Sequence, residues 1–98
     1  MSSAEKSVNR FLQAVADPTR RRILHVLRER NHNASKNGGL CASDIEHSVK
    51  VSQPTISHHM AVLKGAGIIE VHKQGRWMWY KRDEKAIAEF ARRLREFL

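Results

Sequence analysis

Residues 52 to 64 carry polar side chains at positions suited to contact with another molecule. On a helix that turns by about 100° per residue, Ile56, Met60 and Leu63 share one narrow sector and His58 lies nearly opposite. The outward residues are Ser52, Gln53, Thr55, Ser57 and His58, with Lys64 along one flank. Hydroxyl, amide and imidazole groups can hydrogen-bond the edges of nucleic-acid bases. The pattern predicts a helix whose exposed side reads a duplex.

The two adjacent histidines in this segment have different expected surroundings. Neighbouring side chains on a helix diverge by about 100°, whereas a chelating pair needs i, i+4 spacing. His58 and His59 therefore do not form a metal motif. His59 lies about 60° from the core direction, where a histidine packed against the protein is the expected state.

The elements that position this face form a helix-turn-helix over about residues 43–66. Ser43 and Glu46 have the spacing of a capping box at the start of a short helix. Ser52 is expected to cap the next helix, with Pro54 in its first turn. Two helices separated by about three residues are typical of this DNA-binding motif.

A β-hairpin is predicted over about residues 68–82, after a helix end marked by glycines. Its polar turn runs from Lys73 to Arg76, and both of these cations are candidates for contact with a phosphate backbone or a minor groove. Gly75 would let the turn approach closely. Strand alternation puts Trp77 and Trp79 on one face and Met78 and Tyr80 on the other, without deciding which face packs inward.

Amphipathic helices are predicted at both ends, over about residues 4–16 and 84–98. Between the first of these and the helix-turn-helix, another helix opens at Pro18 with basic residues Arg20 to Arg22, and residues 31–39 read as a flexible connection. The arginines are interpreted as a mixture of solvated face and phosphate contacts. A chain this small does not need both terminal stripes to close its core, so self-association through them is expected. The predicted dimer interface comprises Val8, Phe11, Leu12, Ile87, Phe90, Leu94 and Phe97. The alternative is that both helices fold back on their own core.

Composition limits the class of partner. The 98 residues suit one domain, 1–98, which is too small to favour an enzyme with a deep cleft. Eighteen Lys and Arg against ten acidic residues give a formal charge of +8, which indicates a polyanionic partner such as nucleic acid. The alternative is a basic surface that serves solubility. The sequence has no apolar run long enough for a membrane span and no apparent secretory signal, so a cytoplasmic location without membrane partners is expected.

Four segments resemble the ArsR-type winged-helix repressors in order and interval. They are ADPTRRRIL (16–24), LCASDIE (40–46), VSQPTISHHMAVLKGAGII (51–69) and GRWMWYKR (75–82). The resemblance covers roughly residues 11–82. It implies a mainly α fold with a winged helix-turn-helix, and a homodimer through the terminal helices that represses transcription at a duplex operator, an inverted repeat. It places Ser52, Gln53, Thr55, Ser57 and His58 at bases and phosphates, and Gly75 and Arg76 on the wing.

Departures from that pattern concern the sensor sites. The family's arsenic sites use two cysteines one residue apart, but here Ser43 follows Cys41 at that interval. The zinc-sensing members use Asp and His on the last helix, yet residues 83–98 contain no histidine. No metal site and no cofactor are therefore expected. Lys50 occupies a turn position where relatives usually have glycine. Cys41, the single cysteine, remains a possible thiol switch, because a thiol near a helix N-terminus can be reactive; a buried, inert cysteine is the alternative.

Three classes of function follow. The leading one is a sequence-specific repressor of the ArsR type without the usual arsenic and zinc sensor sites. A metal- or redox-responsive repressor using Cys41 is the second, and a winged-helix module that binds RNA or protein through its wing aromatics is the third. An enzyme is disfavoured because Ser57 and His58, the neighbours that a triad would need, point about 100° apart.

Overall fold

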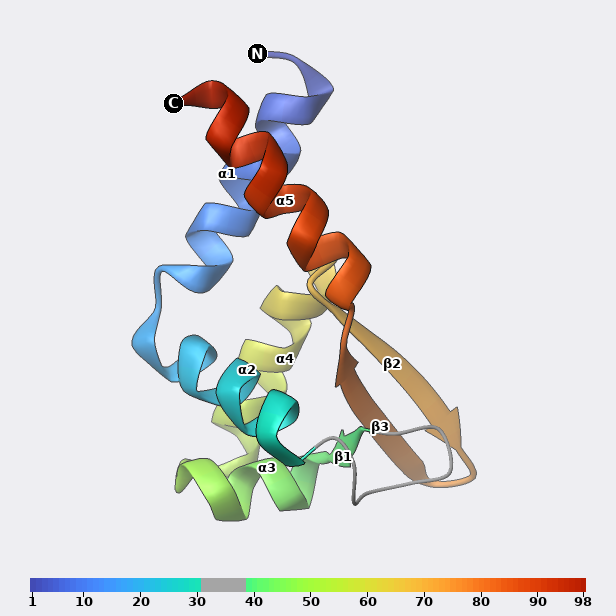
Figure 1. Ribbon diagram of the computed structural model, residues 1–98. Coiled ribbons are helices and arrows are strands. Elements are labelled where there is room, and N and C mark those ends of the chain that lie inside the picture. The colour runs from blue at the N-terminus through green and yellow to red at the C-terminus, as the bar shows by residue number, and fades with distance from the viewer. Residues whose placement is uncertain (31–38) are drawn as a thin grey trace.

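The computed structural model describes residues 1–30 and 39–98, and these form five helices and three short strands (Figure 1). The helices are α1 (Ser3–Val15), α2 (Pro18–Arg30), α3 (Ala42–Val49), α4 (Gln53–Gly65) and α5 (Glu84–Phe97). The strands β1 (Leu40–Cys41), β2 (Ile69–Gln74) and β3 (Trp77–Arg82) form one antiparallel sheet in the order β1-β3-β2. The expectation of a mainly helical chain with a small hairpin is confirmed. Apart from Gly39, the connection predicted over residues 31–39 lies outside the described residues.

The core is built from α2, α3, α4 and the start of the hairpin. Ile56, Met60 and Leu63 on α4 are each at most 1% exposed, so the inward face predicted for this helix is confirmed. Burial of such side chains is the main favourable term in folding. Their buried partners are Ile23, Leu24, Leu27, Ile45, Val49, Ile68 and Ile69.

Strand β1 was not expected, and it changes where α3 begins. Leu40 pairs with Tyr80 and Cys41 pairs with Trp79 on β3, which holds the chain extended up to the helix start. Cys41 is the N-cap of α3, and the Asp44 carboxylate accepts a hydrogen bond from its backbone N–H at 3.3 Å. The capping box predicted at Ser43 and Glu46 is therefore wrong by two residues.

The turn between α3 and α4 has one unusual backbone position. Lys50, the C-cap of α3, is left-handed, with φ 60° and ψ 43°. Ser52 is the N-cap of α4 by its extended backbone, as expected. Its hydroxyl does not cap the helix, however, because it lies 2.9 Å from the hydroxyl of Thr55. The predicted side-chain cap is wrong, and that hydroxyl remains at the protein surface.

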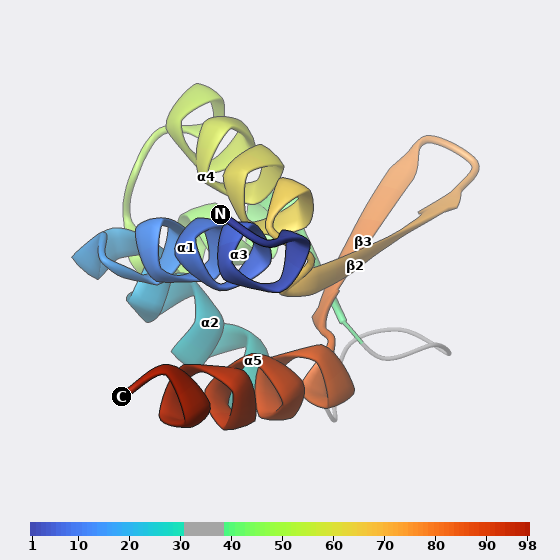
Figure 2. The same ribbon diagram turned by 90° about the horizontal axis from the view of Figure 1, so that it is seen from above.

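The β2–β3 hairpin projects away from the helices (Figure 2). Gln74 pairs with Trp77, so the turn itself is two residues, Gly75 and Arg76. Gly75 has φ +60°, which a side chain would strain and which suits the first central position of a type II′ turn. Tyr80 is partly buried and packs against the core, whereas Trp77 is 58% exposed. The Tyr80 face is thus the one that packs inward.

Helices α1 and α5 form a separate pair at one end of the molecule (Figure 1). The rings of Phe11 and Phe90 stack with their centroids 5.0 Å apart. Asp83 caps α5 by accepting from the N–H of Ala86, yet no residue of α5 is fully buried in the chain. The amphipathic helices expected at both ends are present, and part of each apolar stripe remains at the surface.

Candidate nucleic-acid interface

The outward side of α4 has the geometry that the sequence predicted. The six polar residues proposed for it are all exposed: Ser52, Gln53, Thr55, Ser57, His58 and Lys64. The buried Ile56, Met60 and Leu63 fix the rotation of the helix about its own axis. His58 lies nearly opposite them, Ser57 and Lys64 lie along one flank, and Ser52, Gln53 and Thr55 lie at the start of the helix. This side of α4 therefore presents hydrogen-bonding groups to solvent on a rigid element.

His59 is held differently from its neighbour His58. It is half-buried, and its Nδ1 lies 3.2 Å from an Nη1 of Arg20. Because a guanidinium has donors and no acceptor, His59 Nδ1 accepts in this pair. The same guanidinium donates to the carbonyls of Ala14 at 2.6 Å and Gln13 at 3.2 Å. Arg20 thereby joins the last turn of α1 to the middle of α4.

The other two arginines at the start of α2 also bond to backbone carbonyls. Arg21 donates to the carbonyls of Val15 and Ala16 at 2.8 and 2.9 Å. Arg22 donates to the carbonyl of Val49 at 3.3 Å, at the end of α3. Arg21 and Arg22 are exposed, as a solvated face predicts, but the sequence interpretation missed these bonds to backbone carbonyls. A signal was available, because the last turn of α1 contains no basic residue of its own to meet its free carbonyls.

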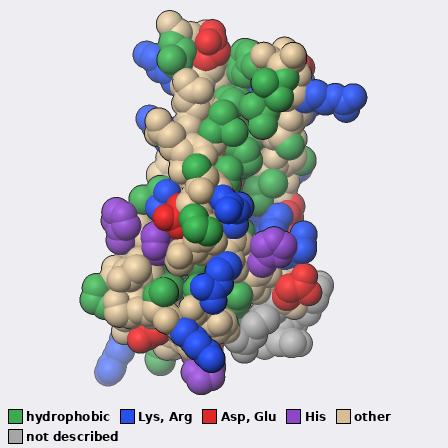
Figure 3. Space-filling model, turned by 90° about the vertical axis from the view of Figure 1, so that its left-hand side faces the viewer, with side chains coloured by type: hydrophobic (Ala, Val, Ile, Leu, Met, Phe, Trp, Pro, Cys, Tyr) green, Lys and Arg blue, Asp and Glu red, His purple; other side chains and the backbone are tan. Residues whose placement is uncertain are grey.

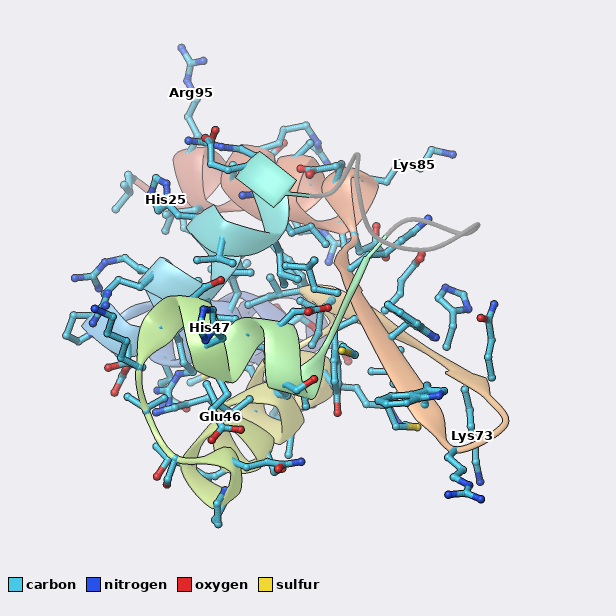
Figure 4. All side chains as sticks on the ribbon, turned by 90° about the horizontal axis from the view of Figure 1, so that it is seen from below. His25, Glu46, His47, Lys73, Lys85 and Arg95 are labelled. Atoms are coloured by element: carbon cyan, nitrogen blue, oxygen red, sulfur yellow. The ribbon has the colours of Figure 1, made fainter. Side chains whose placement is uncertain are left out.

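The hairpin brings a second set of proposed contacts beside α4. Gln53, Ser57 and Arg76 line one crevice, together with the exposed side chains of Trp77 and Met78. An adjoining hollow shares Ser57 and Met78 and extends to Lys64. The structure thus brings Gln53, Ser57 and Lys64 of α4 together with Arg76 of the hairpin along one groove, whereas Ser52, Thr55 and His58 line neither hollow. Lys73, labelled in Figure 4, lies at the hairpin tip and lines neither hollow.

The electrostatics of this groove are set by cations without counter-charges. Among residues 1–30 and 39–98, no carboxylate pairs with Lys64 or Arg76 in the groove, or with Lys73 at the hairpin tip outside it. Tyr80, which lines both hollows, has its pKa raised above the ordinary value by burial, so its hydroxyl stays neutral. The groove therefore carries net positive charge, as a surface for a polyanion requires.

Cys41 is a buried residue that lines the same crevice. It is 8% exposed, and its Sγ is 3.2 Å from the hydroxyl of Ser43 and 3.1 Å from a carboxylate oxygen of Asp44. Within the described part of the chain, no group of three or more His, Cys, Asp or Glu side chains is placed to hold a metal ion. The thiol of Cys41, proposed as a possible switch, is thus hydrogen-bonded and lies at the start of α3.

The proposed dimer residues are divided between the chain's own packing and its surface. Val8 is 2% exposed, and the Phe11–Phe90 stack is internal to one chain. Leu12 and Phe97 are 37% and 49% exposed and line a groove between α1 and α5 with Leu94. Ile87 is half-buried against the core. Figure 3 shows hydrophobic side chains gathered over this end of the molecule.

None of the described helices is both long enough and apolar enough to span a membrane.

The chain is similar to known proteins in both sequence and fold. The model of the bacterial regulatory protein family arsR matches residues 17–71. An uncharacterized HTH-type transcriptional regulator of Methanocaldococcus jannaschii is 42% identical over 80 residues, 82% of this chain and 81% of that protein. The transcriptional repressor SdpR of Bacillus subtilis is 38% identical over 73 residues, 74% of this chain and 72% of the repressor.

Two solved structures show the same fold. An ArsR-like transcriptional regulator from Rhodococcus sp. RHA1 has a TM-score of 0.80 at 24% identity, covering 98% of this chain and 83% of that one. The homodimeric winged helix-turn-helix DNA-binding domain Mb0332 of Mycobacterium bovis has a TM-score of 0.70 at 24% identity, covering 88% and 73%. The winged helix-turn-helix fold expected from the sequence is confirmed.

Proposed function

This chain belongs to the ArsR family of bacterial regulatory proteins, and from that premise we propose how it acts. It is a transcriptional repressor that binds an operator as a homodimer, with α4 in the major groove and the β2–β3 hairpin as a wing on the flanking backbone. The relative SdpR, which matches this chain over about three quarters of each protein, is itself a repressor. Binding of chromosomal DNA implies a cytoplasmic location.

The observation that carries the proposal is the outward side of α4. Gln53, Ser57 and His58 are exposed donors and acceptors on a helix whose opposite side is buried. In helix-turn-helix docking the first turns of the second helix meet base edges. There the amide of Gln53 can hydrogen-bond adenine, and a serine hydroxyl can hydrogen-bond either base of a pair. The methyl group of Thr55 can contact thymine. Ser52 and Thr55 hydroxyls at the start of the helix suit phosphates as well.

Unpaired cations provide the affinity that does not depend on sequence. Lys64 extends along one flank of α4, and Lys73 and Arg76 lie on the hairpin. Gly75 has no β-carbon, so the backbone of the turn can approach a phosphate closely. These residues orient the protein on the duplex, while Gln53 and His58 discriminate between sequences.

A dimer accounts for the exposed apolar groove between α1 and α5. Leu12, Leu94 and Phe97 line it, and a second copy would cover them. The Mb0332 domain, with the same fold, is a homodimer. A two-fold axis would place two copies of α4 about 34 Å apart on one side of the DNA, so the operator is an inverted repeat. Val8 lines the same groove, and Phe11, Phe90 and Ile87 pack within the chain.

We infer that binding, rather than catalysis, is the activity of this chain. Ser57 and His58 are adjacent exposed residues of α4, and among residues 1–30 and 39–98 no third group orients the imidazole toward the hydroxyl. Its relatives are transcriptional regulators. The proposed mode of repression uses no metal or cofactor at Cys41.

A mobility-shift titration on the DNA upstream of the chain's own gene tests the proposal. Duplex binding is expected to weaken linearly in log salt, with a slope of about −0.9 per neutralised phosphate. Removing one half-site should weaken it by a factor of about 10³ or more, toward non-specific binding. Equal affinity for single-stranded RNA at the same salt would instead identify an RNA-binding module.

The dimer is tested separately by Phe97→Glu. A carboxylate in an apolar interface is costly, so this variant is expected to run as a monomer in light scattering and to lose binding to the full operator. Arg95→Gln is the matched control, because it changes the charge by the same amount at a residue that points away from the body of the molecule (Figure 4). A dimeric Phe97→Glu protein would exclude α5 from the interface.

A further inference from the structure

Lys50 adopts a backbone conformation that is unfavourable for a residue with a side chain. It has φ 60° and ψ 43°, and it is the one non-glycine residue with positive φ in the part of the chain that the structure describes. Its N–H donates to the carbonyl of Glu46 at 2.8 Å, which closes the last turn of α3. Glycine adopts this conformation without the clash of a β-carbon. A lysine here therefore makes the fold less stable than a glycine would.

Contacts within the chain do not compensate for this strain. The Lys50 side chain is exposed, and no described carboxylate lies within ion-pair distance of its ammonium group. Glu46, one turn earlier on α3, lines the same hollow without pairing with it. The benefit of a cation at this position must therefore come from outside the chain.

The location of Lys50 indicates what that external group is. The hollow that it lines also contains Ser52, the N-cap of α4, and the imidazole of His47 on α3. Gln53, the first residue of the proposed reading helix, follows Lys50 by three positions. When a second helix enters a major groove, the preceding helix and turn pass over the phosphate backbone. In such a complex, an unpaired ammonium at this turn would lie near that backbone.

We propose that Lys50 contacts an operator phosphate, and that this contact explains why a strained lysine stands in the turn. The inference rests on the proposed function, since it requires a duplex on α4. It extends the proposed contacts to the α3–α4 turn, where Lys50 lines a hollow with Ser52 and His47 that is separate from the crevice lined by Gln53 and Arg76. Phosphate contacts would then come from the α3–α4 turn, through Lys50, as well as from the hairpin, through Lys73 and Arg76.

The test compares stability and DNA binding in substitutions of Lys50. Lys50→Gly should raise Tm by roughly 2 to 6 °C, because it removes the strain. The same change should weaken operator binding at least about fivefold and reduce the salt slope by about 0.9 per protomer, or about 1.8 per dimer. Lys50→Asn, which tolerates this conformation and is neutral, should lose binding like the glycine variant. Lys50→Arg should retain both the affinity and the slope.

Lys85→Gln is the charge-matched control. Lys85 lies on α5, far from the α3 residues Glu46 and His47 (Figure 4), so its loss should leave the salt slope unchanged. If Lys50→Gly gains stability while affinity and slope stay at wild-type values, Lys50 makes no phosphate contact. If the wild-type protein itself shows no salt-dependent duplex binding, the proposed function fails instead.

Discussion

The start of α2 and the groove between α4 and the hairpin both carry basic side chains, but these side chains have different partners. Arg20, Arg21 and Arg22 donate to backbone carbonyls at the ends of α1 and α3. Within the described chain, Lys64 and Arg76 bond to no carbonyl or carboxylate. The first region uses its charge to hold helices together, and the second leaves it available. Basic residues in a chain of formal charge +8 therefore indicate a DNA surface only after their internal partners have been counted.

Among the substitutions considered, Arg20→Ala should lower the stability of the fold the most. The variant loses two bonds from a cation to carbonyls and the contact with His59, and it leaves carbonyls of α1 unpaired. Bonds that involve a charged group contribute more than neutral ones, so the free energy of unfolding should fall by about 2 to 3 kcal/mol. Urea denaturation measures this change.

Arg10→Ala controls for the loss of a positive charge, because Arg10 is exposed on α1 and has no partner among the described residues. Its stability should change by less than about 0.5 kcal/mol. Equal effects of the two substitutions would mean that the carbonyl bonds of Arg20 contribute nothing, and the contrast between the two regions would fail.

Gln53→Ala should have the next largest effect, on specificity. An amide that bonds a base edge discriminates against wrong bases by about 1 to 3 kcal/mol. The variant should thus bind the operator and a scrambled duplex with more similar affinities, while its urea midpoint stays unchanged because the side chain is exposed. His58→Ala should behave in the same way. Undiminished discrimination in both variants would remove α4 from base recognition.

Arg76→Ala should weaken all duplexes alike, by about 1 kcal/mol at moderate salt, and lower the salt slope by about 0.9 per protomer. Arg76 occupies the exposed hairpin turn and packs against no core residue, so stability should not change. Titrating operator and scrambled duplex in parallel separates this result from that of Gln53. A loss confined to the operator would show that Arg76 reads bases.

The contrast also shows which features sequence patterns can predict. The buried side of α4 follows from helical periodicity, because Ile56, Met60 and Leu63 are separated by one or two turns. The start of α3 depends on the pairing of Leu40 with Tyr80, forty residues later in the chain, and a two-residue strand has no periodic pattern. Pairings of that kind are set by the assembled fold.

The carbonyl partner of Arg22 was also beyond local patterns, unlike the nearby α1 carbonyls that Arg20 and Arg21 bond. Arg22 reaches Val49 across 27 positions, and only the packing of α2 on α3 brings the two together. The side chain of Cys41 was predicted correctly to stand near a helix start, but its role as the N-cap depends on β1. Sequence reasoning thus located the exposed chemistry of α4 more accurately than the contacts that hold α4 in place.

Acid should weaken the junction that Arg20 helps to hold. The pKa of Asp17 is lowered below its ordinary value of 3.8. The main cause is the backbone N–H of Arg20, which donates to the Asp17 carboxylate at 3.0 Å, and the positive charge of Arg20 adds to it. A lowered folded-state pKa adds stability above the unfolded-state value, and this stability is lost as the pH falls through the folded-state value. The Tm difference between wild type and Asp17→Asn should therefore be constant above about pH 5 and shrink below about pH 4. A difference that is independent of pH would exclude this linkage.

Cys41→Ser should have the smallest effect, although Cys41 lines the crevice beside Gln53 and Arg76. Two influences on stability oppose each other: a hydroxyl is less suited than a thiol to a site that is 8% exposed, but serine is a better N-cap for α3. Neither changes the exposed cations of the groove. Operator affinity, its salt slope and any response to an effector should consequently equal those of the wild type in parallel mobility-shift titrations under reducing conditions. Loss of effector response with affinity intact would instead make the thiol a sensor, and the groove would then combine DNA recognition with its regulation.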